Sequence, residues 1–215
     1  MKTGMRSCFL VILLALPALA EHDQPRILER IAPEYTDEAR LARLEGSALV
    51  SLVVAEDGSL RDVHVTQPIG LGLDEKAVDA VKHWQFAPAI EGERPVQTMT
   101  RVKVNFRLLI RREDWHLTRA TFEAPDGASE PVIVSAPYPE PDKSPEPSMV
   151  KVSFDVDTEG VPRNITVSES SDEKSARDVT RFLAGWRFQP AMAAGGAVAS
   201  RATLIFAAGA AEVSE

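Results

Sequence analysis

The chain of 215 residues is poor in several residue types, and each shortage excludes a class of protein. Its single cysteine excludes a framework of intrachain disulfides and a metal site built from a cysteine cluster. The 24 lysines and arginines are outnumbered by 32 acidic residues, which argues against a general nucleic-acid binder, because such a protein needs a basic surface. The hydrophobic fraction of 44% is that of an ordinary folded protein, and the length allows one or two domains.

The sequence also lacks the residue patterns that are typical of catalysis and metal binding. The histidines do not have the paired spacing of a metal site. No serine lies in a nucleophile-elbow sequence, and no pair of carboxylates stands beside a recognisable nucleophile or base. We therefore expect no catalytic residues, no metal and no cofactor, and we predict that the protein is not an enzyme. A periplasmic enzyme is the least favoured alternative.

A long hydrophobic run is missing as well. The apolar run from Phe9 to Ala20 has about twelve residues, whereas a membrane span needs roughly twenty. Basic Lys2 and Arg6 precede the run and small residues end it, which is the pattern of a secretory signal peptide. We expect residues 1–20 to be a signal peptide cleaved after Ala20, leaving no stable membrane span. The alternative is an uncleaved N-terminal helix that anchors the chain.

One pattern is present twice. Residues 50–89 and 152–191 align with a constant offset of 102 and no gap, and ten of the forty positions are identical. Chance at an average composition gives roughly two or three identities. The identical pairs include Trp84/Trp186 and Phe86/Phe188, so we interpret the chain as a duplicated domain.

Each copy has the pattern of an α+β domain. In the first copy, apolar residues alternate along 48–54 and 60–65, as expected of strands with one buried face. A helix is expected over 73–84, with Asp74 as its cap, and a third strand region over 96–109. A short amphipathic helix over 36–45 is expected to precede these elements.

The second copy repeats this order with two differences. Ser170 and Glu173 have the spacing of a capping box for its helix. The position of the first short helix holds several prolines between Pro137 and Pro147, so that helix is expected to be missing.

We predict an α+β chain of two tandem small domains, each a three-stranded antiparallel sheet packed by one or two helices. Between the domains, Trp115–Phe122 and Val132–Ala136 are candidates for an extra hairpin. The predicted divisions are a signal peptide over 1–20, a first domain over 27–110, a connecting segment over 111–136 and a second domain over 137–209.

Five short motifs of the first copy follow one another in a distinctive order. They are Pro33-x-Tyr35, Glu45-Gly46, Asp57-Gly58, Leu73-Asp74 with Ala77, and Trp84-x-Phe86-x-Pro88. This order resembles the C-terminal domain of the TonB family of periplasmic energy transducers. The resemblance covers residues 27–110 closely and residues 137–209 weakly, which makes the second copy a degenerate one.

The resemblance implies a function in protein binding. Family members transmit force from an inner-membrane motor to outer-membrane transporters, and they are taken to bind a short transporter peptide as an added strand. By this resemblance the third strand region is the candidate edge that binds a partner. The alternative is that its basic residues keep an edge strand from pairing with other chains. The candidate residues are Arg101, Val102, Lys103, Val104, Asn105 and Phe106.

The repeated Trp-x-Phe motif has two interpretations. Trp84 and Trp186 extend the apolar face of a helix in each copy, and Phe86 and Phe188 follow them in the motif. A binding platform is one reading, but core burial is the expected role, because large aromatic side chains dominate the burial of apolar surface.

Together these observations predict a non-catalytic protein-interaction module in the periplasm. The expected partner is an outer-membrane TonB-dependent transporter or another envelope protein, and no nucleic acid. The alternative is a membrane-anchored TonB-like transducer subunit that keeps its N-terminal helix. The chain departs from the family pattern at Ala32 and Thr36, where the family often has Gln and Pro. A long proline-rich arm before Ile27 is not expected.

Overall fold

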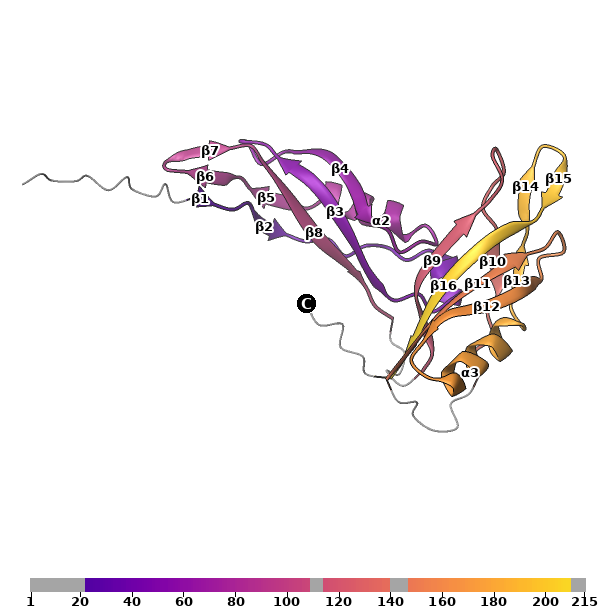
Figure 1. Ribbon diagram of the computed structural model, residues 1–215. Helices are drawn as coiled ribbons and strands as arrows, with labels where there is room; N and C mark the ends of the chain where they lie inside the picture. Colours follow the sequence, from indigo (N-terminus) through magenta and orange to yellow (C-terminus); the bar gives the residue numbers. More distant parts are fainter. Residues whose placement is uncertain (1–21, 109–113, 140–146, 210–215) are drawn as a thin grey trace, which may run out of the picture.

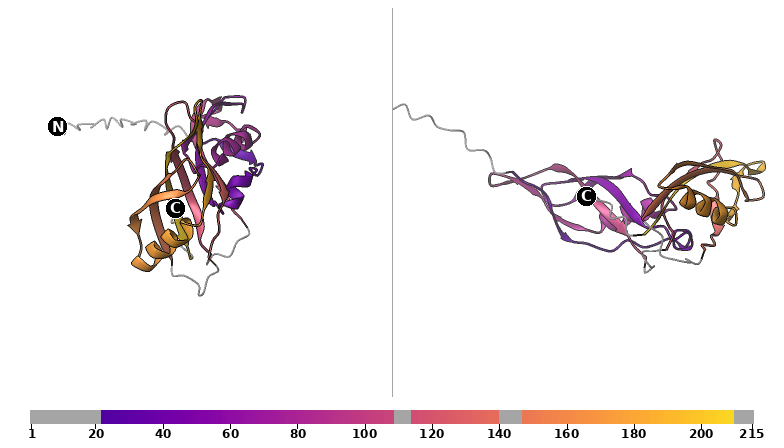
Figure 2. Two further views of the ribbon diagram at one scale, coloured as in Figure 1. Left: turned by 90° about the vertical axis from the view of Figure 1, so that its right-hand side faces the viewer. Right: turned by 60° about the horizontal axis from the view of Figure 1, so that its bottom comes forward.

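The computed structural model describes residues 22–108, 114–139 and 147–209 (Figure 1). The predicted signal peptide over 1–20 and its cleavage after Ala20 lie outside the described residues. The described part is an α+β structure with two main antiparallel sheets, as predicted. Figure 2 shows the two sheets placed one after the other along the long axis of the molecule.

The first unit is built on a three-stranded sheet in the order β4-β3-β8. Alternate residues of its central strand, including Val50 and Leu52, are fully buried, and they face the helix α2. Two small pairings extend the unit, since β2 pairs with β5 and β1 lies on the hairpin of β6 and β7. The elements are β1 (His22–Asp23), β2 (Arg26–Glu29), α1 (Asp37–Leu41), β3 (Gly46–Val54), β4 (Leu60–Gln67), α2 (Leu73–Lys82), β5 (Gln85–Ala87), β6 (Ala89–Glu91), β7 (Arg94–Val96) and β8 (Thr98–Phe106).

The second unit repeats this arrangement, and β3, β5, β6, β7 and β8 each have a counterpart exactly one repeat offset, 102 residues, later. Its sheet has the order β12-β11-β16-β9 and therefore contains a fourth strand, β9, which comes from the connecting segment. Its elements are β9 (His116–Glu123), β10 (Val132–Ser135), β11 (Ser148–Val156), β12 (Pro162–Ser170), α3 (Glu173–Leu183), β13 (Arg187–Gln189), β14 (Ala191–Ala193), β15 (Gly196–Val198) and β16 (Ser200–Ala208).

The hairpin suggested for the connecting segment is not formed. β9 pairs with β16, and β10 pairs with β13, so the two strands join different sheets. The reason lies in their buried residues. Leu117 and Ala120 of β9 and Ile133 of β10 each enter the hydrophobic core. A hairpin of these two strands alone would leave those side chains with too little apolar surface to cover them.

The helix ends also differ from the prediction. α1 begins after Thr36, whose hydroxyl accepts from the N–H of Ala39 at 3.1 Å, but it ends at Leu41 and not at residue 45. Arg43 has a φ of 47°, and this left-handed backbone turns the chain out of the helix toward β3.

Asp74 and Ser170 do not cap their helices. Asp74 lies inside α2 and accepts from the N–H groups of Ile69 and Gly70, both at 2.9 Å, so it orders the preceding loop. In the second unit the cap is Asp172, which accepts from the N–H of Ser175 at 2.8 Å. The missing counterpart of α1 was expected around 137–147, most of which lies outside the described residues.

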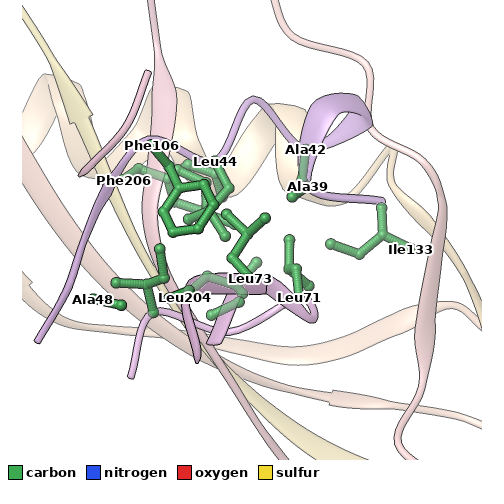
Figure 3. Close-up of a cluster of buried hydrophobic side chains, with 14 of the residues drawn as sticks. Ala39, Ala42, Leu44, Ala48, Leu71, Leu73, Phe106, Ile133, Leu204 and Phe206 are labelled. Carbon is green, nitrogen blue, oxygen red and sulfur yellow. The ribbon is translucent and has the colours of Figure 1, made fainter. Parts of the chain in front are cut away.

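The two units share one hydrophobic core. Figure 3 shows side chains of both meeting between α1 and the sheets, among them Leu44 and Phe106 from the first unit and Leu204 and Phe206 from the second. Tyr138 also bridges the units, because its hydroxyl donates to the carbonyl of Ala42 at 2.6 Å. Separation of the units would expose this shared apolar surface to water.

Candidate partner-binding edge

β8 is the last strand of the first sheet. It pairs with β3 along its whole length, from Gly46 opposite Phe106 to Val54 opposite Thr98. Within the described ranges, no strand pairs with its other edge. The six residues proposed from the sequence, Arg101 to Phe106, therefore lie on a strand whose outer backbone groups can accept a further strand.

The six residues are divided between the two faces of the sheet. Val102, Val104 and Phe106 are buried on the core side, whereas Arg101, Lys103 and Asn105 are exposed on the open side. A strand added to this edge would extend both faces, since successive side chains alternate across a sheet. Its apolar residues would then continue the core, and its other residues would lie beside the two cations.

The corresponding edge of the second sheet is occupied. β16 is the counterpart of β8, and β9 pairs with it in antiparallel register, with Ala120 opposite Leu204 and Phe122 opposite Ala202. The chain thus supplies its own strand at the position where β8 has none. This segment was not recognised from the sequence as a sheet strand of the second unit, although its apolar residues at 117, 120 and 122 were a usable signal.

β9 is bonded on its other edge as well. The N–H of Ala120 donates to the carbonyl of Ile69 at 2.9 Å, and the N–H of Leu117 donates to that of Arg43 at 3.1 Å. The carbonyl of Leu117 accepts from the N–H of Glu45 at 2.8 Å. β9 therefore covers the edge of β16 and, through Leu117 and Ala120, ties the second sheet to the first unit.

The aromatic residues of the repeated motif lie in the core. Trp84, Phe86, Trp186 and Phe188 are all buried, and the indole N–H of Trp84 donates to the carbonyl of Ile31 at 2.8 Å. In the second unit the ring of Trp186 lies 5.6 Å from that of Phe206 in an edge-to-face arrangement. These residues close the core and do not line the edge of β8.

Perturbed pKa values belong to residues that hold the structure together. Burial raises the pKa of the Tyr138 hydroxyl and that of the Glu38 carboxyl. Hydrogen bonds from Ser59 hold the pKa of Asp57 low, and the N–H of Val161 does the same for Asp157, each in a strand-connecting turn. Turn geometry accounts for both aspartates.

The residues that the structure describes contain no group of three or more histidine, cysteine or acidic side chains placed to hold a metal ion. None of the helices in the same ranges has the length and apolar character that a bilayer crossing requires.

Comparison with known proteins identifies the family. The family model described as Gram-negative bacterial TonB protein C-terminal matches residues 31–108 and 143–207, which include β8 and nearly all of β16. The chain belongs to the TonB C-terminal family. The predicted resemblance and its extension to a second copy are thereby confirmed.

Two similar proteins come from Pseudomonas aeruginosa. The chain is 35% identical over 82 residues to "Protein tonB2" of that organism, a match that covers 38% of this chain and 30% of the relative. The solution NMR structure of the Pseudomonas aeruginosa TonB CTD matches with 23% identity and a TM-score of 0.34, covering 41% of this chain and 91% of that one.

Proposed function

We propose that the protein is a non-catalytic module of the periplasm that binds an extended segment of an envelope protein as a strand added to β8. An outer-membrane TonB-dependent transporter is the partner class that family membership favours. The observation that carries the proposal is the difference between two equivalent edges, since β16 is covered by β9 while β8 has no strand beside it among the described residues.

The physical basis is backbone pairing. An exposed strand presents a row of N–H and C=O groups that an extended peptide can satisfy, and side-chain pockets then select the sequence. β8 is nine residues long and pairs with its neighbour without a register shift, so it offers a regular template. The pairing of β9 with β16 supports the proposal, because β16 is the counterpart of β8 and accepts a strand at the equivalent edge.

The two units have different roles in this proposal. Because β9 already occupies the edge of β16 and is bonded on both sides, the second unit binds no partner there. It supports the first unit through the shared core, and a single peptide is bound per chain.

Selection of binding peptides tests the proposal without knowledge of the partner. Random peptides displayed on phage are selected on the intact chain, and the best one is synthesised and titrated into isotope-labelled protein. We expect NMR shift changes centred on β8. An analogue with alternate N-methylated amides should not bind, because it lacks the backbone donors of a strand. Shift changes centred elsewhere, or an N-methylated peptide that binds equally well, would contradict strand addition.

A membrane-anchored transducer subunit is the second candidate, because family membership and the apolar run over 9–20 are compatible with it. Mass spectrometry of the native N-terminus separates the two. A mature chain that begins at Glu21 supports the periplasmic module, and a chain that retains residues 1–20 supports the anchored form.

A further inference from the structure

We propose that the open edge of β8 selects an extended segment in which acidic and apolar residues alternate. This inference rests on strand addition at β8 and adds the chemistry of the partner. It comes from a contrast in charge between the open faces of the two sheets.

Two cross-strand rows of the first sheet carry positive charge without an acidic residue. The register places Ser51 between His64 and Arg101, and Leu49 between Gln67 and Lys103. No acidic side chain stands in these cross-strand rows, and within the described ranges Arg101 and Lys103 make no ion pair. A third cation, Arg61, lies on β4 beside the exposed Asp62, so Arg101 and Lys103 of β8 are the cations nearest the open edge.

On the second sheet, two cross-strand rows combine charges of opposite sign, while the row that corresponds to that of Arg101 is uncharged, with Thr203 between Ser153 and Thr121. Lys151 forms an ion pair with Glu169 at 3.1 Å. Arg201 has Asp155 opposite it on one side and Glu123 of β9 on the other. In the Arg201 row, which corresponds to the Met99 row of the first sheet, the added strand contributes a carboxylate beside a cation. At the open edge the cations have no such neighbour.

β9 shows which positions of an added strand would meet the cations. Arg101 corresponds to Thr203, which faces Thr121, and Lys103 corresponds to Ile205, which faces Arg119. Residues that face each other across strands have Cβ atoms about 5 Å apart, so opposite charges there attract and like charges repel. Acidic residues at these two positions would therefore pair with Arg101 and Lys103.

The core side of the added strand would be apolar. In β9 the residues on that side are Leu117, Ala120 and Phe122, opposite Phe206, Leu204 and Ala202. Their counterparts on β8 are Val104, Val102 and Thr100. A partner with small or apolar residues at these alternate positions would extend the core without burying a charge.

The same geometry disfavours a second copy of this chain as the occupant. A β9 segment from another molecule would place Arg119 beside Lys103, and like charges directly opposite are destabilising. Lys103 thus disfavours the segment that the chain itself carries, while both cations attract an acidic one.

Three peptides that span residues 116–125 test the proposal by fluorescence anisotropy with the intact mature chain. One has the native sequence, one carries Arg119→Glu and Thr121→Glu, and one carries Arg119→Gln and Thr121→Gln. NMR shift mapping reports whether each binds at β8. We expect the Glu peptide to bind about fivefold or more tightly than the Gln peptide, and the native peptide to bind most weakly. The advantage of the Glu peptide should shrink in high salt.

Protein variants provide the matched control. Arg101→Gln with Lys103→Gln should remove the preference for the Glu peptide. Lys174→Gln with Arg177→Gln removes the same charge from the exposed face of α3 and should leave the preference unchanged. Far-ultraviolet circular dichroism and thermal melting show whether each variant is folded.

The remaining outcomes separate acidic selection from strand addition. Equal binding of Glu and Gln peptides at β8 would overturn acidic selection and leave strand addition intact. Tighter binding of every peptide to the Arg101→Gln, Lys103→Gln variant would mean that the cations only protect the edge, which also overturns acidic selection. If neither these peptides nor any selected peptide shifts the β8 resonances, strand addition itself is wrong.

Discussion

Gly70 determines how closely β9 can approach the loop after β4. Its φ of 94° is a left-handed conformation that residues with a side chain rarely adopt. A Cβ at this position would lie 2.2 Å from the carbonyl oxygen of Ala120. Because Ala120 also donates to the neighbouring Ile69, β9 can dock on the first unit only if residue 70 lacks a side chain.

Gly70→Ala should therefore be much more destabilising than the same change at a similar but open position. Gly127 has a φ of 76° with nothing within 4 Å of the added Cβ, so Gly127→Ala should cost about 1 kcal/mol from backbone strain alone. Gly70→Ala adds a backbone clash, and we expect a loss of about 3 kcal/mol in urea unfolding. Equal losses for the two variants would contradict the close approach of β9.

Glu38 is a second residue on which the contact between the units depends. Its carboxylate accepts from the N–H of Ile133 at 2.7 Å, and burial raises its pKa above the usual value of 4.5. The folded state therefore binds the proton more tightly than the unfolded state does. The stability of the native chain should fall, relative to a Glu38→Gln variant, as the pH rises from 4.5 through the raised pKa.

Urea unfolding of the native chain and of Glu38→Gln at a series of pH values measures this difference. The amide of Gln keeps an oxygen that can accept from Ile133 and carries no charge to bury. Glu38→Ala serves as the comparison that leaves the N–H without its partner, at a cost of about 1–3 kcal/mol. A difference between native chain and Glu38→Gln that does not change with pH would contradict the burial of a titrating carboxyl.

Among the elements, β9 connects the two units, because it is a strand of the second sheet and its backbone also bonds to the first unit. Leu117 is fully buried between the units, and Ala120 bonds to the first unit while facing β16 of the second. Leu117→Ala should lower the free energy of unfolding by about 2–5 kcal/mol, as for other large-to-small changes in cores. Val134→Ala, at an exposed position of β10, is the control and should lower the free energy of unfolding by less than about 1 kcal/mol. If the two variants lost similar amounts of unfolding free energy, the account of Leu117 of β9 as a core residue would be wrong.

Elements with a strong local pattern could be predicted from the sequence, and those fixed by distant contacts could not. Alternation in 48–54 and helical spacing in 73–84 led to β3 and α2, because one buried face imposes each period. β9 was missed as a strand of the second sheet, since its pairing joins residues as distant as His116 and Ala207. The sequence placed Arg101 and Lys103 on an edge strand but could not indicate that their rows lack acidic neighbours, because register is a tertiary property.

For the whole molecule, a shared core implies that the two units unfold together. Side chains from both meet around Leu44, Phe106 and Phe206 in one buried hydrophobic cluster. We expect NMR resonances of β3 and of β11 to lose native intensity at the same urea concentration, in one cooperative transition. Two separate midpoints would contradict a shared core and indicate independent domains.

The central claim is that one edge is open where its counterpart is closed, and amide hydrogen exchange resolved by NMR tests it most directly. In the unbound chain, β8 should show a period-two pattern, because alternate N–H groups bond to β3 while the others face solvent. The N–H groups of β16 should all be protected, since β11 and β9 flank it. Uniform protection along β8, or a period-two pattern along β16, would contradict the account.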